Sequence, residues 1–409
     1  MRMKLNKPSQ LLLVALASIL VAGFMTACAT LTVDFVFVAS SKAAGTNNYG
    51  ELDIFEVNSE SGHMRQIPAS PVPSQGRLPV AEAVSSDAAS LFVANQDDNN
   101  IVQFVIGSDG KLYPYNTVNT PGVFPLGLAS SAANLFVVDT YQPLPTCSTA
   151  APCSGSVGVF PLTAATGSTP VAIGSPAVNG SISSNYWPLT VAGRPNDVIA
   201  PTAIAVLASG TDVYVTAYDT SVSPTVGYIF GFSVGSGGVL TALAGSPFAA
   251  GIRPSALASD KSGTYLYATD YAGNDVLAYT IASGVLTPLA GSPFKAGTNP
   301  SAIVVDQKYS FAYVANATDS NITAYSMSSG KLTSLGTYAT GLEPVALGID
   351  PSTSHFLYSV NYLGNTVSGF ELSATDGTLL DTQNSPFPSN DLPTAVAAIP
   401  HAGTGAGVP

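Results

Sequence analysis

A short apolar pattern recurs along the chain, and each copy is followed by a segment in which apolar and polar residues alternate. Most copies lie 44 to 55 residues apart, and one spacing of 78 holds the insertions. The copies are FVFVAS at 35, LFVANQ at 91, LFVVDT at 135, VYVTAY at 213, YLYATD at 265, FAYVAN at 311 and FLYSVN at 356. A fixed period in this range predicts a repeat architecture with seven units.

The segments around each copy predict three further strands per unit. The alternating segments, such as IVQFVI at 101 and VLAYTI at 276, are followed by a Gly turn and another strand, which is typical of β-hairpins. A Pro-led apolar segment precedes each copy, as in LPVAEAV, APTAIAV and EPVALGI. Four strands per unit define a propeller blade, so the sequence predicts an all-β, seven-bladed β-propeller with four antiparallel strands per blade.

The two ends of the chain are predicted to share one blade. The chain opens with strands two to four of a blade and closes with a lone first strand at 393 to 399. Pairing them would close the ring and remove two exposed sheet edges. We expect a propeller over residues 29–400, with insertions at about 141–156 and 177–200, and a tail at 401–409. The structural alternative is an eight-bladed ring with a degenerate blade in 157–207, where only one strand set is found.

The first 28 residues are predicted to be an export signal. A basic head from Arg2 to Lys7 precedes an apolar run at 11–25, which is too short for a confident membrane span. The end of this segment, MTAC, resembles the bacterial lipobox and predicts lipidation of Cys28. The alternative is ordinary signal cleavage beside Cys28. Either way we expect an exported protein of the cell envelope, touching the membrane only through a lipid anchor.

Two further cysteines, Cys147 and Cys153, lie six residues apart within CSTAAPC. In an oxidising compartment thiols this close tend to pair, which predicts a disulfide. No His lies in that stretch, so a metal site is not indicated there. The disulfide would hold an insertion rather than the whole fold.

The charge balance excludes nucleic acid as a partner. The chain has 13 basic and 25 acidic residues, and 10 basic residues remain once Arg2, Lys4 and Lys7 are removed with the signal. A phosphate backbone would be repelled by such a surface. We expect a monomer that binds a small polar ligand, with an envelope protein as a further possible partner.

The tandem blades with strands such as YVAN resemble the bacterial β-propeller lactonases of the phosphogluconolactonase type, with YVTN-like repeats, over roughly residues 31–400. This resemblance implies a seven-bladed ring and a lactone-hydrolase precedent that needs no metal or cofactor. It also implies a site at the channel mouth built around His, Arg and Glu. His63 and His355 fall at hairpin turns and His401 follows the last strand, so the expected His is missing or relocated.

Candidate ligand-binding residues lie where loops meet at one end of the channel. The loops before strand one and after strand two share that face of a propeller. Near the proline, Arg77, Ala200, Arg253, Asn299, Glu343 and Asp391 are found; Arg194 precedes a proline inside an insertion and is not placed. The predicted ligand-binding residues are Arg253, Asn95, Asp139, Asp270, Asn316, Asn361, Tyr271 and Tyr362. The plainer interpretation of the Asn and Asp set is that these side chains satisfy backbone groups where strands end.

One position breaks the repeat pattern. The third residue after each proline is aliphatic in six copies and a carboxylate in the seventh: Glu82, Leu128, Ile204, Leu257, Ile303, Leu347 and Val396. Glu82 is therefore expected on a buried or channel-facing surface, paired with Arg77 or serving a ligand, because an unpaired buried charge is costly. As a catalytic hypothesis, Glu82 is the general acid or base of a lactone-opening site, polarised by Arg77. A structural ion pair is the alternative.

These observations leave three candidate functions. The first is an exported propeller that binds a sugar-acid or lactone-like ligand at the channel mouth. The second is a metal-independent lactone hydrolase that uses Glu82 with Arg77. The third is a protein-interaction scaffold whose insertion at 141–200 makes the contact. No nucleophile elbow, zinc-binding helix or EF-hand spacing is present, and NQDDNN at 95–100 clusters acids without a calcium-loop pattern.

Overall fold

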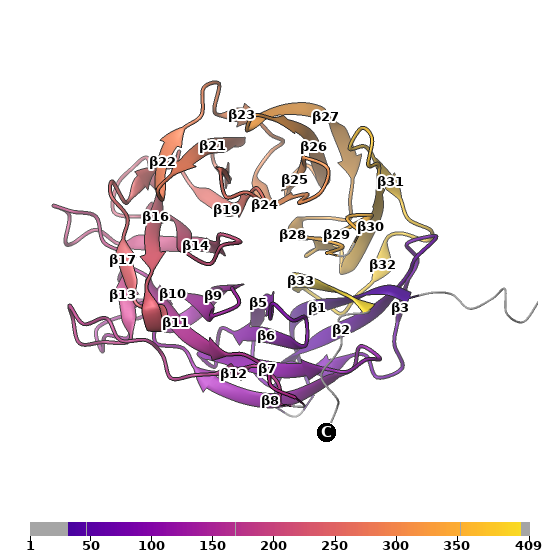
Figure 1. The fold of residues 1–409 in the computed structure, drawn as a ribbon, viewed down its shortest axis with the longest axis horizontal. Coiled ribbons are helices and arrows are strands. Elements are labelled where there is room, and N and C mark those ends of the chain that lie inside the picture. Colours follow the sequence, from indigo (N-terminus) through magenta and orange to yellow (C-terminus); the bar gives the residue numbers. More distant parts are fainter. Residues whose placement is uncertain (1–31, 46, 168, 352, 402–409) are drawn as a thin grey trace, which may run out of the picture.

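The structure, a computed structural model, describes residues 32–45, 47–167, 169–351 and 353–401. Within these residues the strands form seven sheets arranged around a central axis (Figure 1). The prediction of a seven-bladed β-propeller is therefore confirmed, and the eight-bladed alternative is wrong. Cys28 and the predicted export signal lie outside the described residues. No helix in the described part of the chain is long and apolar enough to span a bilayer.

Each blade runs from a strand beside the central axis to one at the rim. We number the blades along the chain as blade 1 (β5–β8), blade 2 (β9–β13), blade 3 (β14–β18), blade 4 (β19–β23), blade 5 (β24–β27), blade 6 (β28–β32) and blade 7 (β33 with β1–β4). The innermost strands are β5 (Pro79–Val84), β9 (Val123–Ser130), β14 (Ile199–Val206), β19 (Pro254–Ser259), β24 (Pro300–Val305), β28 (Pro344–Ile349) and β33 (Pro393–Pro400). Each contacts the innermost strand of both neighbouring blades, which closes the ring.

The second and third strands of each blade are the most deeply buried. The second strands are β6 (Ser90–Asn95), β10 (Asn134–Tyr141), β15 (Asp212–Asp219), β20 (Tyr265–Asp270), β25 (Phe311–Asn316), β29 (Phe356–Asn361) and β1 (Thr32–Ala44). The third strands are β7 (Asn100–Ile106), β11 (Ser156–Thr163), β16 (Val226–Val234), β21 (Asp275–Ala282), β26 (Asn321–Ser328), β30 (Thr366–Leu372) and β2 (Tyr49–Asn58). Apolar side chains on both faces of these strands pack against the next blade, so the core is a series of layers between blades.

The outer strands are long in two blades and split into two short pieces in the others. They are β8 (Leu112–Asn119), β12 (Ala172–Ile173) with β13 (Tyr186–Pro188), β17 (Leu240–Ala242) with β18 (Phe248–Ala249), β22 (Val285–Pro288) with β23 (Phe294–Lys295), β27 (Lys331–Ala339), β31 (Leu379–Asp381) with β32 (Phe387–Pro388), and β3 (Met64–Gln66) with β4 (Val72–Pro73). A short 3₁₀ turn, η1 (Ser236–Gly238), precedes β17. All five split strands contain a Ser-Pro pair between their pieces, where the missing N–H of proline interrupts the ladder.

The chain termini close the ring as the sequence predicts. Strand β33 pairs antiparallel with β1 from Asp34 opposite Pro400 to Ser40 opposite Pro393. Figure 1 shows the last strand, in yellow, lying beside the first, in indigo. Blade 7 is thus held together by pairing across more than 350 positions of sequence, and β1 is paired on both of its edges.

Neighbouring blades are joined by two repeated hydrogen bonds. In the second strands of blades 3 to 5 a buried tyrosine donates its hydroxyl to a glycine carbonyl of the next blade, as Tyr267 does to Gly330 at 3.0 Å. In the innermost strands the residue after the proline carries a hydroxyl in four blades and donates to the proline carbonyl of the next blade. These bonds join Thr202 to Pro254, Ser255 to Pro300, Ser301 to Pro344 and Thr394 to Pro79.

Candidate functional site

Seven residues, each standing directly before the proline of an innermost strand, surround one end of the central channel. We call them the mouth ring: Leu78, Phe124, Ala200, Arg253, Asn299, Glu343 and Leu392. Because all seven innermost strands occupy equivalent places in their blades and run in the same direction along the axis, these residues lie at the same end of the channel. The mouth ring is the feature of the fold best placed to contact a ligand in the channel.

The backbone of the mouth ring is held in an uncommon conformation. Five of its residues have φ between 56° and 58°: Leu78, Phe124, Asn299, Glu343 and Leu392. For a bulky residue this left-handed conformation costs about 1 to 2 kcal/mol. The preceding blade stabilises it in three cases through an asparagine side chain, which accepts the ring residue's N–H. These pairs are Phe124 with Asn99 at 2.6 Å, Asn299 with Asn274 at 2.8 Å, and Leu392 with Asn365 at 2.9 Å.

The sequence-based assignment of Arg77 and Asp391 to this ring is wrong by one residue. The left-handed residues Leu78 and Leu392 occupy the ring positions, and the charged residues before them form ion pairs instead. Arg77 donates from Nε to Asp98 Oδ1 at 2.7 Å, and Asp391 pairs with Lys42. Neither charged group is therefore free for a ligand.

Arg253 is the charged group that the mouth presents without an acidic partner. Its guanidinium lies between two tyrosine rings, 5.2 Å from the centroid of Tyr218 and 5.1 Å from that of Tyr271. Each of the other arginines in the described part of the chain pairs with a carboxylate. Two aromatic faces hold a guanidinium by cation–π attraction while leaving its N–H donors available in the plane between them.

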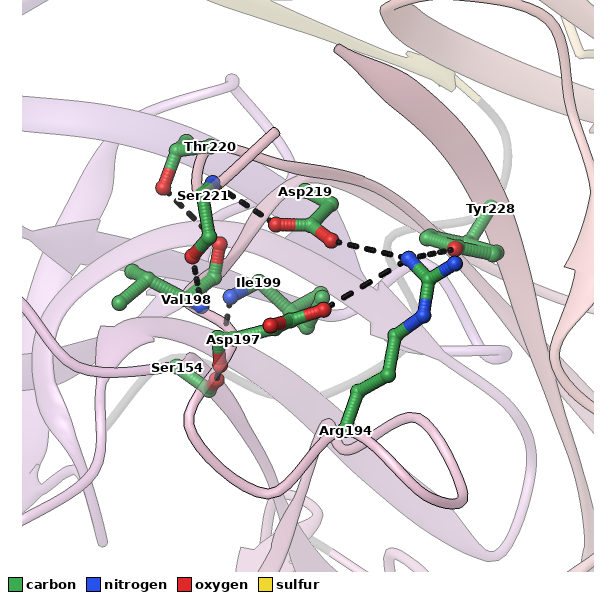
Figure 2. Close-up of polar contacts among 9 residues, drawn as sticks. All are labelled: Ser154, Arg194, Asp197, Val198, Ile199, Asp219, Thr220, Ser221 and Tyr228. Carbon is green, nitrogen blue, oxygen red and sulfur yellow. Dashed lines mark hydrogen bonds and ion pairs between the residues drawn. The ribbon is translucent and has the colours of Figure 1, made fainter. Parts of the chain in front are cut away.

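Arg194, which the sequence left unplaced, is locked by acidic residues (Figure 2). It reaches from the insertion before β14 to Asp219 at 3.5 Å and to Asp197 at 3.6 Å, and it contacts the hydroxyl of Tyr228 at 3.4 Å. Desolvation, followed by the neighbouring Asp219, raises the pKa of Asp197. This arginine fastens the insertion onto blade 3 rather than facing a ligand.

Three of the predicted ligand-binding side chains hold loops instead. Asp270, Asn316 and Asn361 are at most 2% exposed. Asp270 accepts four backbone N–H groups, including that of Arg253 at 2.8 Å, so it positions the arginine from behind. Asn316 accepts the N–H of Gly297, and both asparagines donate to side chains of their own blades. These contacts are those of the plainer interpretation, in which the side chains satisfy backbone and side-chain groups of their own loops; direct ligand binding by these three stays a prediction.

Asn95 and Asp139 occupy the same position in blades 1 and 2 and are fully buried. Asn95 donates to Asn100 at 2.9 Å, and Asp139 accepts the N–H of Gly122 at 2.9 Å. Desolvation raises the pKa of Asp139 to about 7. Neither side chain is exposed at the mouth, so these two also serve their own loops in this structure, and ligand contact stays a prediction.

The predicted tyrosines lie at the mouth and remain partly exposed. The backbone N–H of Tyr362 donates to the carbonyl of Glu343 at 2.8 Å, and that of Tyr271 donates to the carbonyl of Arg253 at 2.9 Å. Tyr271 also borders a hollow of about 360 Å³ between blades 5 and 6. These contacts bring Arg253, Tyr271 and Tyr362 to the same face, as the sequence predicts.

Glu82 is buried between blade 7 and blade 1, as the register of the first strands predicts. Both of its carboxyl oxygens are sealed from solvent and lack a hydrogen-bond partner of normal geometry. Desolvation raises the pKa of Glu82 to about 8, while the nearby backbone of Ala397 lowers it in part. The predicted pairing with Arg77 is wrong, because Arg77 binds Asp98. A sealed carboxyl cannot reach a substrate, so the catalytic pair is not formed in this structure.

The disulfide between Cys147 and Cys153 is present, with Cα atoms 5.5 Å apart. It lies in the long loop between β10 and β11, which carries one of the insertions. Across the described ranges, no group of three or more His, Cys, Asp or Glu side chains is placed to hold a metal ion.

Sequence reasoning missed two exposed leucines of the mouth. Leu342 and Leu363 are 61% and 58% exposed and line the hollow beside Tyr271. The available signal was a leucine inside two otherwise polar turns, GLEP and YLGN. A search limited to charged and aromatic residues does not find these leucines.

Comparison with known proteins finds one matching family and several solved structures with a similar fold. Residues 284–396 match the family described as "Lactonase, 7-bladed beta-propeller", whereas no curated protein matches the chain. A periplasmic gluconolactonase of Pseudomonas aeruginosa is 16% identical, covers 90% of this chain and 99% of its own, and has a TM-score of 0.69. A Bacteroides fragilis protein, described as a candidate 6-phosphogluconolactonase, is 17% identical over 91% of this chain and 99% of its own, with a TM-score of 0.67.

A protein from Lactobacillus plantarum is also similar, with 14% identity over 90% of this chain and 99% of its own and a TM-score of 0.65. At such identities the similarity to solved structures shows the fold. Together with the family match over residues 284–396, it supports the resemblance drawn from the repeats, and the fold that these proteins share with the chain is a seven-bladed β-propeller.

Proposed function

We propose that the protein binds a sugar acid or its lactone at the channel mouth, with Arg253 as the anchoring cation. The observation that carries this proposal is the guanidinium held between Tyr218 and Tyr271 without a carboxylate partner. A guanidinium donates well to carboxylate or carbonyl oxygens, and tyrosine faces and hydroxyls suit a ligand of this size and polarity. The gluconolactonase among the similar structures supports the choice of ligand class.

The test is calorimetric titration with gluconate and with glucono-1,5-lactone. We expect Arg253→Gln to weaken gluconate binding by at least about 10-fold, because a charge-assisted hydrogen bond is lost. The matched control is Arg65→Gln, since Arg65 pairs with Glu56 on the outer hairpin of blade 7. Equal affinities of the Arg253 variant and the wild type would contradict the proposal.

Lactone hydrolysis is a second candidate, favoured by the family match. In such a reaction the Arg253 guanidinium would stabilise the oxyanion that forms when water attacks the lactone carbonyl. The same protein samples test it, by comparing the rate of gluconate formation with the spontaneous rate and with the Arg253→Gln variant. A rate equal to the spontaneous rate would show that the protein does not hydrolyse the lactone, and binding alone would remain as the proposed function.

Export is part of the proposal. The disulfide between Cys147 and Cys153 and the periplasmic relative support a location outside the cytoplasm, in agreement with the signal expected over residues 1–28. Cell fractionation with and without Cys28→Ser tests the location and the lipid anchor together.

A further inference from the structure

The hollow beside Tyr271 has a mixed lining. Its volume is about 360 Å³, and it lies at the mouth face between the loops of blades 5 and 6. Thr318 and Glu343 contribute polar groups, whereas Leu342 and Leu363 contribute apolar ones. Tyr271 lines the hollow, and its ring also lies 5.1 Å from the Arg253 guanidinium, so one aromatic side chain contacts both places.

The two leucines are unusually exposed for residues that line a concavity. Leu342 is 61% exposed and Leu363 is 58% exposed. A single exposed leucine needs no explanation, but two that face the same hollow form an apolar surface that a ligand can cover. Small-molecule sites combine apolar walls of this kind with a few polar groups that fix orientation.

The hollow and the arginine, which both involve Tyr271, carry charges of opposite sign. Glu343 borders the hollow, and its carboxylate has no ion-pair partner in the described part of the chain. An anionic group would be repelled from the hollow and attracted to Arg253. A ligand that occupies both places therefore has its carboxylate or lactone carbonyl at Arg253 and an uncharged portion against the leucines.

We propose that the ligand is amphiphilic, with a carboxylate or lactone head at Arg253 and an alkyl substituent in the hollow between Leu342 and Leu363. This inference rests on the proposed function, because it uses the same anchoring arginine. It narrows the ligand class from sugar acids in general to acids or lactones that carry an apolar chain.

The experiment compares butanoate with octanoate by calorimetric titration of the full-length protein. We expect octanoate to bind at least about 10-fold more tightly, because four further methylene groups leave water. The double variant Leu342→Ser/Leu363→Ser should lose this gain, so that its affinities for octanoate and butanoate become similar. Both leucines are exposed, so the variant keeps the fold. Leu380→Ser is the matched control, since Leu380 is 68% exposed on the outer strand β31.

The outcomes separate this inference from the proposed function. Equal affinities for the two carboxylates, or a gain that survives in the double variant, overturn the amphiphilic ligand alone. The proposed function is also overturned if Arg253→Gln leaves the affinities for butanoate and gluconate unchanged, or if neither butanoate nor gluconate binds the wild type. A gain that Leu380→Ser abolishes equally also overturns the inference, because it would reflect nonspecific apolar binding.

Discussion

The seam between blades 7 and 1, where the ring closes, differs from the seam between blades 5 and 6. Both seams are joined by the same hydroxyl bond, from Thr394 to Pro79 at 2.8 Å and from Ser301 to Pro344 at 2.6 Å. They differ at the third residue after the receiving proline. Leu347 packs into an apolar cluster in one seam, whereas Glu82 occupies the equivalent place in the other.

The difference shows that closure does not require an optimal apolar seam. Glu82 lies near Asp53, whose pKa is raised to about 6 mainly by desolvation. The buried acid is tolerated in this seam because Glu82 keeps its proton at neutral pH. Strand pairing between β33 and β1 therefore has to hold blade 7 in place without much help from this contact.

The largest effect is expected from removal of the closing strand. A chain that ends before Asp391 lacks β33. Strand β1 then loses its pairing partner in blade 7, and β5 of blade 1 loses the innermost strand that packs beside it. We expect the cooperative thermal transition to disappear or its midpoint to fall by more than about 10 °C. Calorimetry measures it, with a chain that ends at Pro400 as the control. Equal midpoints for the two chains would show that the seam does not hold the ring.

A smaller effect is expected from the buried acid. Because the folded state raises the pKa of Glu82 to about 8, it binds the proton more tightly than the unfolded chain does. The free energy of unfolding should therefore fall as the pH rises from about 4.5 to about 8, by about 2 to 5 kcal/mol. Glu82→Leu should remove most of this slope and raise stability at pH 8.

Chemical denaturation at a series of pH values measures this slope. The control is Glu60→Gln, which changes an exposed carboxylate in a turn. Asp53 and Asp139 also have raised pKa values, so a residual slope between pH 4 and pH 7 is expected in the Glu82 variant. A wild-type stability that rises from pH 5 to pH 8 would contradict the burial of an unpaired Glu82.

The smallest effect concerns the hydroxyl bonds between blades. Ser301→Ala removes the bond to Pro344 and should lower the free energy of unfolding by about 1 kcal/mol. Blade 6 has Val345 at this position, so Val345→Thr offers the missing bond to the carbonyl of Pro393 and tests the reverse change. Denaturant midpoints of the two variants, compared with the wild type, should move in opposite directions. Shifts of the same sign would show that side-chain size, not hydrogen bonding, governs the seam.

The sequence predicts the blades well because each repeats the same alternation, and repetition identifies register. That register placed Glu82 in the interior correctly. It did not identify the neighbours of Glu82, since Arg77 turns away through the left-handed backbone at Leu78 and reaches Asp98. A pattern of polar and apolar residues does not reveal a backbone dihedral angle of this kind.

The candidate site residues also differ in how well a sequence pattern identifies their role. Arg253 was identified because few arginines precede a proline, and its chemistry does not depend on fine geometry. For Asp270 and Asn316, which hold backbone N–H groups in the structure, the sequence leaves both roles open, because an amide or carboxylate at a strand end suits backbone N–H groups or ligands equally well. Burial separates the two roles, and burial depends on the loop of the same blade that folds over the side chain.

The mouth ring has a consequence for how such a protein can change its ligand. Each of its residues belongs to a separate blade, and in three of them an asparagine of the preceding blade holds the backbone N–H. Seven side chains can therefore be exchanged independently while strand pairing is preserved. A combinatorial library at these seven positions is the natural way to redirect recognition, with asparagine and glycine as the substitutions best suited to the left-handed sites.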